Sequence, residues 1–352
     1  MKILELNLER GWRGGERQTL WTMQRLRDTG VEVGLLAREG ELLAERALAE
    51  GFTVHECGSG FRALAALAKV GRHYDLVHSQ TGGALTWAVA ARPFHGRPVV
   101  ATRRVAFAFN SRLTLVKYRL ADKVIAISRA CAEALVEGGV KNIDLISSAV
   151  QPFTPDPGRI AAFKREHGLE GKRIVATCAA LTIDKDPATL VDAVAHIQTP
   201  DTVLVHFGRG PMSDEMQARV KAKGLEDRYK LVGFIRDVEQ FYPMMDAFVM
   251  SSSIEGLGSS VLDAMLARVP VASTAAGGLR ESCAEGRGRL APIGNPPALA
   301  KEIDVLLDIS PQARAARQAQ IDLAYDWVVA NCSVQAMGDA YRDLFARMLA
   351  KP

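Results

Sequence analysis

Short apolar runs rich in Val, Ile and Leu alternate along the first half of the chain with longer stretches in which apolar residues recur every three or four positions. The short runs predict β-strands at 2–7, 31–37, 53–57, 75–79, 98–103, 123–128 and 143–148. The longer stretches, such as ERQTLWTMQRLRD at 16–28, predict amphipathic helices. Strands that are apolar on both faces and separated by helices indicate a parallel sheet covered by helices on both sides.

The segment QPFTPDPGR at 151–159 contains three prolines and interrupts this alternation, so it predicts a linker between two domains. A second series of strands is predicted at 173–181, 201–208, 229–233, 247–252 and 270–274. From about residue 295 the pattern is wholly helical. We therefore predict an α/β protein with Rossmann-like, doubly wound domains at 1–155 and 156–330, and a terminal helix at 331–352 that packs back on the first domain. Two such domains facing each other would form a cleft at the carboxyl ends of their strands.

The composition is that of an ordinary globular protein: 352 residues are 48% hydrophobic and 24% charged, and the mean hydropathy is +0.02. The longest nearly apolar run, at 84–91, is far shorter than the ~18 residues that a membrane span needs. Glu5 and Glu9 lie where a signal peptide would be apolar, so we expect a cytoplasmic chain. The 5 cysteines form no CxxC pair, which favours reduced thiols over disulfides or a zinc site.

Positive charge is concentrated in residues 51–150, which carry 13 Lys and Arg against 6 Asp and Glu. It is densest at 103–129, where seven cations face Asp122 alone and are interleaved with aromatic residues. This cluster predicts contact with an acidic partner, either anionic lipid on the inner face of the cytoplasmic membrane or a phosphorylated glycan acceptor. A solvated face of helix and loop is the other interpretation. The sequence pI of 8.8 and the absence of a nucleic-acid-binding motif argue against nucleic acid as a partner.

The segment 251–281 reads as a strand end, a glycine-rich turn, a helix, a strand and a second glycine pair. Gly256 and Gly258 allow a ligand to approach the backbone, and a helix that begins near Gly258 offers unpaired N–H groups to an anion such as a diphosphate. Asp263 lies one helical turn after Ser259, where a carboxylate can accept hydrogen bonds from sugar hydroxyls. On pattern alone, a purely structural strand–turn–helix joint explains the segment equally well.

The segment 255–281 resembles the Glu-x7-Glu region of the family 4 retaining glycosyltransferases. It contains Glu255, seven intervening residues and Asp263, followed by AMLARVPV and GGLRE. Further segments look like landmarks of that family in the family's order: GGER at 14–17, ADKVIAIS at 121–128, ALTIDKDP at 180–187, HFGRGP at 206–211 and LVGFIRD at 231–237. The resemblance covers nearly the whole chain and implies the GT-B fold of two Rossmann-like domains. It also implies transfer of a sugar from a nucleotide diphosphate sugar with retention at the anomeric carbon, without a metal or other cofactor.

By resemblance, Glu255 contacts the donor sugar and Asp263 the nucleotide ribose, although Asp is one methylene shorter than the family's Glu. Lys185 occupies the place of the donor-phosphate lysine, whereas Ala179 stands where the family commonly has an arginine. Arg209 or Arg104 would supply the missing charge. The donor site predicted in this way comprises Lys185, Arg209, Ile235, Gly256, Leu257, Gly258, Ser259, Ser260 and Asp263.

Gly14 and Gly15 follow the first strand and resemble the loop that closes on donor and acceptor in this fold, although a plain tight turn before the helix is an equal interpretation. Glu255, Lys185 and Gly15 form the predicted catalytic group. The fifth strand ends in two arginines where many relatives have a histidine, and a guanidinium there could hold a phosphate or an acidic acceptor. The predicted acceptor site comprises Arg17, Arg103 and Arg104.

The function that these features predict is transfer of a sugar to a cell-surface glycan precursor, such as lipopolysaccharide, with a glycan or glycolipid as acceptor. The triplet Asp184-Lys185-Asp186 also spells a DxD metal–nucleotide motif, which we discount because the order of the two domains fits GT-B. A nucleotide-sugar epimerase of the same fold and a non-catalytic nucleotide-sugar binding module remain alternatives. Interconversion of the free donor would identify the epimerase, and donor hydrolysis would exclude the binding module.

Overall fold

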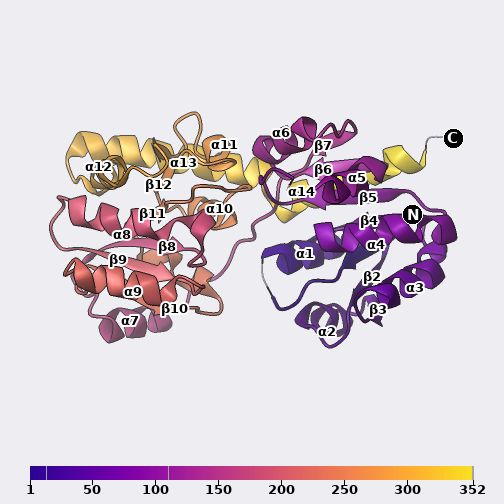
Figure 1. Ribbon diagram of the computed structural model, residues 1–352. Helices are drawn as coiled ribbons and strands as arrows, with labels where there is room; N and C mark the ends of the chain where they lie inside the picture. The colour runs from indigo at the N-terminus through magenta and orange to yellow at the C-terminus, as the bar shows by residue number, and fades with distance from the viewer. Residues whose placement is uncertain (13, 110, 351–352) are drawn as a thin grey trace. The chain divides into compact units, whose positions relative to one another are not determined.

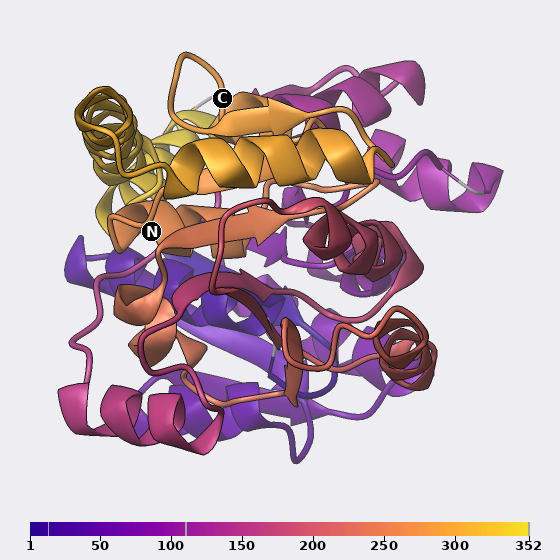
Figure 2. The ribbon, with the colours of Figure 1, turned by 90° about the vertical axis from the view of Figure 1, so that its left-hand side faces the viewer.

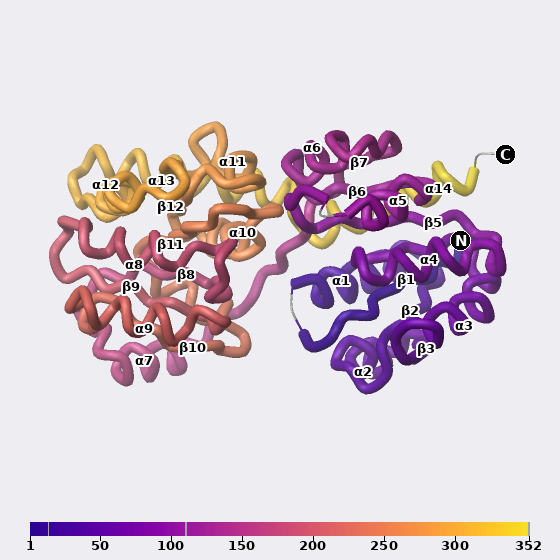
Figure 3. The backbone as a smooth tube through the Cα atoms, viewed as in Figure 1, coloured from indigo at the N-terminus to yellow at the C-terminus, as the bar shows by residue number. Residues whose placement is uncertain are grey.

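The structure, a computed structural model, describes residues 1–12, 14–109 and 111–350. The chain forms two compact units: unit 1 contains Met1–Ala149 and the segment from Asn331 onward, and unit 2 contains Val150–Ala330. The backbone trace leaves unit 1 after Ala149 and returns to it after Ala330 (Figure 3). The first segment of unit 1 therefore ends a few residues before position 155, the boundary expected from the sequence.

Unit 1 is built on a parallel sheet with the strand order β3-β2-β1-β4-β5-β6-β7 (Figure 1). Its strands are β1 (Lys2–Asn7), β2 (Glu32–Arg38), β3 (Thr53–Cys57), β4 (Leu76–Ser79), β5 (Val99–Arg103), β6 (Lys123–Ala126) and β7 (Ile143–Leu145). In the register, Leu4 of β1 lies opposite Gly34 of β2 on one side and Val77 of β4 on the other. The strand order reverses direction beside β1, so right-handed crossovers place helices on both faces of the sheet.

The helices of unit 1 divide between the two faces of this sheet. One set is α1 (Gly14–Asp28), α2 (Leu42–Ala49) and α14 (Val334–Leu349). The other is α3 (Phe61–Val70), η1 (Gly71–His73), α4 (Gly82–His95), α5 (Arg112–Leu120) and α6 (Arg129–Glu137). The main core of unit 1 joins the first set to the sheet, with Met23 and Leu26 of α1 and Tyr341 and Phe345 of α14 fully or almost fully buried. The C-terminal helix α14 is thus an integral part of unit 1.

Unit 2 is built on a second parallel sheet, with the strand order β10-β9-β8-β11-β12-β13. Its strands are β8 (Arg173–Cys178), β9 (Thr202–Phe207), β10 (Tyr229–Gly233), β11 (Ala247–Met250), β12 (Val271–Thr274) and β13 (Arg289–Ala291). Its helices are α7 (Pro157–Glu166), η2 (Ile183–Lys185), α8 (Pro187–His196), α9 (Ser213–Ala222), η3 (Val238–Met244), α10 (Ser259–Leu266), α11 (Leu279–Ser282), α12 (Pro296–Leu307) and α13 (Pro311–Asn331). Helices α8, α9 and α12 share one buried core with the sheet (Figure 2).

The α/β class and the two doubly wound sheets of the GT-B fold are confirmed. The predicted linker at 151–159 is wrong in its last residues, because α7 begins at Pro157. Asp156 caps this helix by accepting from the N–H groups of Gly158 and Arg159. Proline is favourable in the first turn of a helix, where its missing N–H costs nothing, so Pro157 starts an element instead of breaking one.

No helix in the described part of the chain is both long and apolar enough to cross a membrane. The five cysteines, all of which the structure describes, form no disulfide bond. Within the same residues, no cluster of three or more His, Cys, Asp and Glu side chains is arranged to hold a metal ion.

Candidate active site

The loops after β8 and β11 meet at the carboxyl edge of the unit 2 sheet. Strand β8 lies between β9 and β11, so the strand order reverses there, and in open α/β sheets ligands bind beside such a reversal. The backbone N–H groups of Ser253 and Ile254 donate to the carbonyl of Asp184 at 2.9 and 3.2 Å. The Ser251 hydroxyl donates to the carbonyl oxygens of Lys185 and Asp186 at 3.0 and 2.9 Å. These bonds hold the two loops against each other.

An ion pair joins two of the predicted catalytic residues, which are far apart in the sequence. The Lys185 ammonium donates to Glu255 Oε2 at 2.5 Å, and the two side chains are only 23% and 11% exposed. Glu255 also accepts from the Ser252 hydroxyl at 3.2 Å and from the N–H of Gly256 at 3.2 Å. Its carboxylate therefore has a fixed position beside a cation, as expected of a group that must face a defined atom of a ligand.

Two glycines allow the 271–282 segment to pack directly on the backbone that carries Glu255. Gly277 has a φ of +46°, and a Cβ there would lie 2.0 Å from the Glu255 carbonyl oxygen. A Cβ on Gly278 would lie 2.2 Å from the Gly256 carbonyl oxygen. The N–H of Gly278 donates to the Glu255 carbonyl at 3.0 Å. No side chain fits at either position, which gives a structural reason for the second glycine pair.

Helix α10 begins without a side-chain cap. Its N-cap is Gly258, at a φ of +84°, and no side chain accepts from the N–H groups of the first turn. Thr81, Ser111, Ser128 and Asp186 cap α4, α5, α6 and α8 through their side-chain oxygens, whereas α2, α3 and α9 begin, like α10, without a side-chain cap. An uncapped helix start with partly exposed Ser259 and Ser260 is suited to bind an anion through backbone N–H groups and the helix dipole.

Asp263 lies deeper in α10 than the predicted ribose contact suggests, because it is only 7% exposed. Its charge helps to raise the pKa of the Cys178 thiol and of the Tyr242 hydroxyl, although burial is the larger cause for both. The Tyr242 hydroxyl in turn donates to the carbonyl of Ser260 at 3.2 Å, next to the start of α10. Asp263 is therefore close enough to Cys178, the last residue of β8, for their charges to interact.

The loops after β9 and β10 bring Arg209 to the same edge of the sheet. A Cβ on Gly208 would lie 1.9 Å from the Ala179 carbonyl oxygen, so the loop after β9 packs directly on the loop after β8. The exposed guanidinium of Arg209 covers Gly233, where a Cβ would lie 2.9 Å from Arg209 Nε. Ile235 follows in the loop after β10 and is partly exposed. Arg209 thus offers a cation near the position of Ala179, where the family's arginine is absent.

The buried side chain of His206, in β9, links the loop after β8 to strand β10. Its Nε2 contacts the Ala179 carbonyl at 3.1 Å and its Nδ1 contacts the Tyr229 hydroxyl at 2.8 Å. Burial is the main reason that the pKa of His206 is lowered from 6.5 to about 4, because the charged imidazole would be desolvated.

This lowered pKa predicts how the stability of the protein depends on pH. Between pH 6.5 and 4 the unfolded chain binds a proton at His206 that the folded chain does not, so stability falls as the pH decreases. Going from pH 7.5 to 5, His206 should remove about 2 kcal/mol from the free energy of unfolding. Urea unfolding of wild type and His206→Gln at both pH values checks this. The variant should lose about 2 kcal/mol less than wild type, and equal losses would contradict the assignment.

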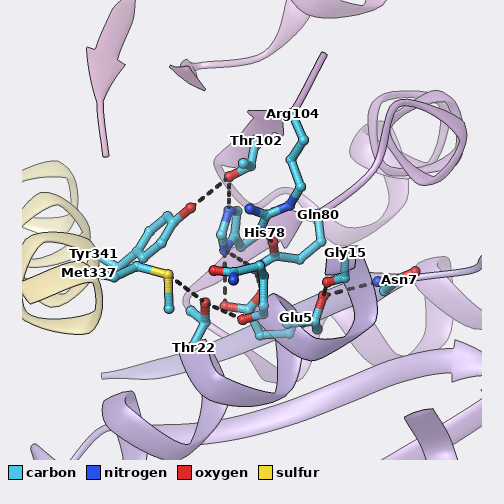
Figure 4. A network of polar contacts seen from close by, with 12 residues as sticks. Glu5, Asn7, Gly15, Thr22, His78, Gln80, Thr102, Arg104, Met337 and Tyr341 are labelled. Atoms are coloured by element: carbon cyan, nitrogen blue, oxygen red, sulfur yellow. Dashed lines mark hydrogen bonds and ion pairs between the residues drawn. The ribbon is translucent and has the colours of Figure 1, made fainter. Parts of the chain in front are cut away.

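A buried polar network occupies the corresponding edge of unit 1, where β1 lies between β2 and β4 (Figure 4). Glu5 of β1 accepts from His78 Nδ1 at 3.0 Å and from the Gln80 amide at 2.8 Å. His78 Nε2 contacts the Thr102 hydroxyl at 2.8 Å, and Thr102 contacts the Tyr341 hydroxyl of α14 at 3.1 Å. All five side chains are almost completely buried. The network links α14 to the ends of β4 and β5.

This network orients Arg104. The Gln80 side-chain nitrogen donates to Glu5, so the Gln80 side-chain oxygen remains available as an acceptor. Arg104 Nη2 donates to that oxygen at 2.5 Å. Arg104 Nη1 donates to the Ser148 hydroxyl at 3.1 Å. Arg104 is partly exposed, so the guanidinium is held in place and still available to a ligand. Sequence reasoning missed Glu5 and Gln80 as supports, although an acidic residue inside an apolar strand was a signal that could have indicated the network.

Arg103 does not belong to an exposed acceptor site. It is 4% exposed, donates to the Phe107 carbonyl, and its guanidinium lies 4.1 Å from the centre of the Phe109 ring. Strand geometry explains the difference, since successive residues of a strand point to opposite faces and only Arg104 extends past the end of β5. Arg17 is partly exposed on α1, with its guanidinium 4.8 Å from the centre of the Trp21 ring. Gly15 has open space around its Cβ position.

The cluster at 103–129 is also less available than its sequence suggests. Most of its seven cations have partners within unit 1, among them Arg103, Arg104, Lys117, Arg119 and Lys123. Lys123 is paired with Asp144 at 3.1 Å, and Arg119 donates to the Gly138 carbonyl at 2.7 Å. These residues are therefore not a continuous basic surface.

The comparison with protein families agrees with both units. Residues 12–152 match the family described as Glycosyltransferase Family 4, and residues 160–322 match Glycosyl transferases group 1. The chain is a family 4 glycosyltransferase. The two matches cover the loops that carry Gly15, Arg104, Lys185, Arg209 and Glu255.

Relatives of this glycosyltransferase differ in their named acceptors. The chain is 30% identical over 189 residues to the 2-deoxystreptamine glucosyltransferase of Streptomyces kanamyceticus, which covers 50% of this chain and 49% of that protein. It is 31% identical over 160 residues to the lipopolysaccharide core biosynthesis glycosyltransferase LpsE of Rhizobium meliloti, covering 45% of each. The matched part thus spans about half the length of these relatives.

Its fold matches that of a structure solved with a nucleotide sugar bound. HepE of Anabaena in complex with UDP-glucose superposes with a TM-score of 0.85 at 22% identity, covering 99% of this chain and 100% of that one. At this level of identity, the superposition shows the GT-B fold.

Proposed function

We propose that this family 4 glycosyltransferase moves a hexose from a nucleotide diphosphate sugar to a cell-surface glycan or glycolipid precursor of the lipopolysaccharide type, in the cytoplasm and with retention at the anomeric carbon. The observation that carries the proposal is the pairing of Lys185 with Glu255 beside the uncapped start of α10. A cation, free backbone N–H groups and a fixed carboxylate are the groups that a diphosphate and its attached sugar require.

The donor would be held by groups that come from four loops. Lys185 and the backbone of Gly256, Leu257, Gly258, Ser259 and Ser260 would bind the diphosphate, with Arg209 as the second cation. Asp263 would accept from the ribose, and Ile235 would lie against the nucleoside. Glu255 would lie beside the sugar ring. These groups bind negative charge more strongly as the diphosphate leaves, which lowers the barrier to departure.

The transfer step would occur on one face of the sugar. The acceptor hydroxyl oxygen bonds to the anomeric carbon as the bond from that carbon to the phosphate oxygen breaks. The departing phosphate oxygen takes the proton of the acceptor hydroxyl, so the products are a glycoside and a nucleoside diphosphate. Lys185 stabilises the leaving group, and Glu255 stabilises the positive charge that develops on the ring.

The acceptor would bind to unit 1 near Gly15, Arg17 and Arg104. The guanidinium of Arg104, fixed by Gln80 and Ser148, is suited to a phosphate or carboxylate on the acceptor. The relative LpsE is named for lipopolysaccharide core biosynthesis, which favours an acceptor of this chemistry.

A screen of UDP, GDP, ADP and CMP by thermal shift tests the proposed donor class. A nucleotide that binds only the folded protein raises the melting temperature, and at a hundredfold excess over Kd it adds about 2.7 kcal/mol to stability. We expect one nucleoside diphosphate to produce a rise of several degrees, whereas the matching nucleoside should produce none because it lacks the diphosphate. Absence of a shift with all four would contradict the proposal.

The same nucleotide then distinguishes the three activities. Slow release of the nucleoside diphosphate from the sugar donor without acceptor, measured by chromatography, is the result expected of a transferase. Interconversion of the intact donor would instead identify an epimerase. Binding without turnover, even in the presence of glycan acceptors, would identify a binding module.

A further inference from the structure

Asp263 by itself does not complete a site for the ribose of a donor nucleotide. It is only 7% exposed and lies one turn of α10, roughly 6 Å, beyond Ser259 at the helix start. A ribose carries hydroxyl groups on C2′ and C3′, and each is a hydrogen-bond donor. A carboxylate that is short and almost completely buried presents little of its surface to them. A second acceptor nearer the start of α10 would complete the site.

Helix η3 carries a second carboxylate to the same edge of the unit 2 sheet. Strands β8, β9, β10 and β11 are parallel, so the chain must return from the carboxyl edge to the amino edge between Gly233, which ends β10, and Ala247, which begins β11. Helix η3 lies on this return path, and its first residues are therefore the nearest to the carboxyl edge. Glu239 is in that first turn and is partly exposed.

A hydrogen bond fixes which side of η3 faces the start of α10. The Tyr242 hydroxyl donates to the Ser260 carbonyl at 3.2 Å, and the Tyr242 side chain is fully buried. Residues three apart are eclipsed in a 3-10 helix, so Glu239 lies on the same side of η3 as Tyr242, one turn or roughly 6 Å nearer the carboxyl edge. Glu239 is therefore placed beside the first turn of α10, whereas Asp263 lies one turn deeper.

The electrostatics of two buried groups agree with this placement. Burial is the main reason that the pKa of the Cys178 thiol and the pKa of the Tyr242 hydroxyl are raised. The negative charges of Asp263 and Glu239 raise both pKa values further. Because Coulomb interactions weaken with distance, Glu239 lies near the last residue of β8, as Asp263 does. The two carboxylates thus approach the donor site from two elements, η3 and α10.

We propose that Glu239 makes this glycosyltransferase specific for a ribonucleotide donor by accepting from one ribose hydroxyl, while Asp263 accepts from the other. Glu239 has the longer side chain and the more exposed position, which give it the reach that Asp263 lacks. A nucleotide without the matching hydroxyl would leave a desolvated carboxylate without a hydrogen-bond donor, so the site would reject it. This inference rests on the proposed function, because the ribose belongs to the proposed donor.

Calorimetry tests the inference with UDP, or whichever of the screened nucleotides binds, and with its 2′-deoxy and 3′-deoxy forms. Wild type should bind each deoxy form roughly ten- to a hundredfold more weakly, since each lacks one hydrogen bond to a carboxylate. Glu239→Ala should abolish the discrimination against one deoxy form and keep it against the other. Glu239→Gln, which retains a neutral acceptor, should keep part of it. Asp263→Asn should reduce the discrimination against the other form.

Matched controls separate hydrogen bonding to the ribose from a structural role of Glu239. Glu226→Ala removes the same charge from an exposed position of unit 2 and should discriminate as wild type does. The melting temperature checks that each variant is folded. Failure of wild type to bind any screened nucleotide would contradict the proposed function itself. Equal binding of the three forms by wild type, undiminished discrimination in Glu239→Ala, or equal weakening of all three forms in that variant would overturn this inference alone.

Discussion

A Glu255→Gln variant should lose roughly ten- to a hundredfold in kcat and bind the nucleoside diphosphate at least as tightly as wild type. The carboxylate stabilises positive charge that appears on the sugar only in the transition state, and a charged hydrogen-bond partner contributes about 1.5–3 kcal/mol. Its removal also releases the Lys185 ammonium from the 2.5 Å ion pair. The diphosphate then no longer competes with the Glu255 carboxylate for Lys185, so its affinity should not fall.

Steady-state kinetics and calorimetry with the nucleoside diphosphate measure the two effects separately. Gln has nearly the shape of Glu, but its single carbonyl oxygen can accept from only one of the Ser252 hydroxyl and the Gly256 N–H, which bond to different oxygens of Glu255. Circular dichroism checks that the fold is unchanged. Glu226→Gln, at an exposed position of unit 2, is the control and should behave as wild type. A Glu255→Gln variant with normal kcat and weakened nucleotide binding would place Glu255 at the diphosphate instead of the sugar.

The sequence was sufficient to predict both sheets because parallel strands buried on two faces leave a strong pattern. The carboxyl ends of the strands were less well predicted. The apolar run predicted a strand at 173–181, but β8 ends at Cys178. The following residues pack on β9 and on the loop after it: the Ala179 carbonyl accepts from His206 of β9, and the N–H of Leu181 donates to the Arg209 carbonyl at 3.3 Å. β13 was missed because three residues, Arg289–Ala291, are too few to show a period.

The candidate site was predicted only as two separate segments. Nothing in a local pattern indicates that Lys185 pairs with Glu255, because the contact depends on the strand order that places β8 next to β11. The same limit explains Arg103 and Arg104, which are identical in type and adjacent in sequence. One is buried against Phe109 and the other is oriented by Gln80, and only the tertiary structure distinguishes them.

Lys185→Ala should weaken nucleoside diphosphate binding by roughly ten- to a hundredfold, because a charge-assisted contact to phosphate is removed. Lys185→Arg should recover part of the affinity by restoring the charge. The exposed Lys221 provides the control, since Lys221→Ala removes the same charge from the same unit away from the loop after β8. Affinity is measured by calorimetry, with the melting temperature as a check on folding. Unchanged affinity in Lys185→Ala would show that this lysine does not contact the diphosphate.

A double variant that combines Lys185→Ala with Glu255→Gln tests whether the ion pair restrains Lys185 before the donor binds. In wild type, Lys185 must break its ion pair with Glu255 before it binds phosphate, which lowers the observed affinity. In Glu255→Gln no such pair has to be broken. Lys185→Ala should therefore cost more in the Glu255→Gln background than in wild type, by about 1 kcal/mol, the usual coupling between side chains in contact. Equal costs in the two backgrounds would mean that Glu255 does not restrain Lys185, and that the two residues contribute independently to donor binding.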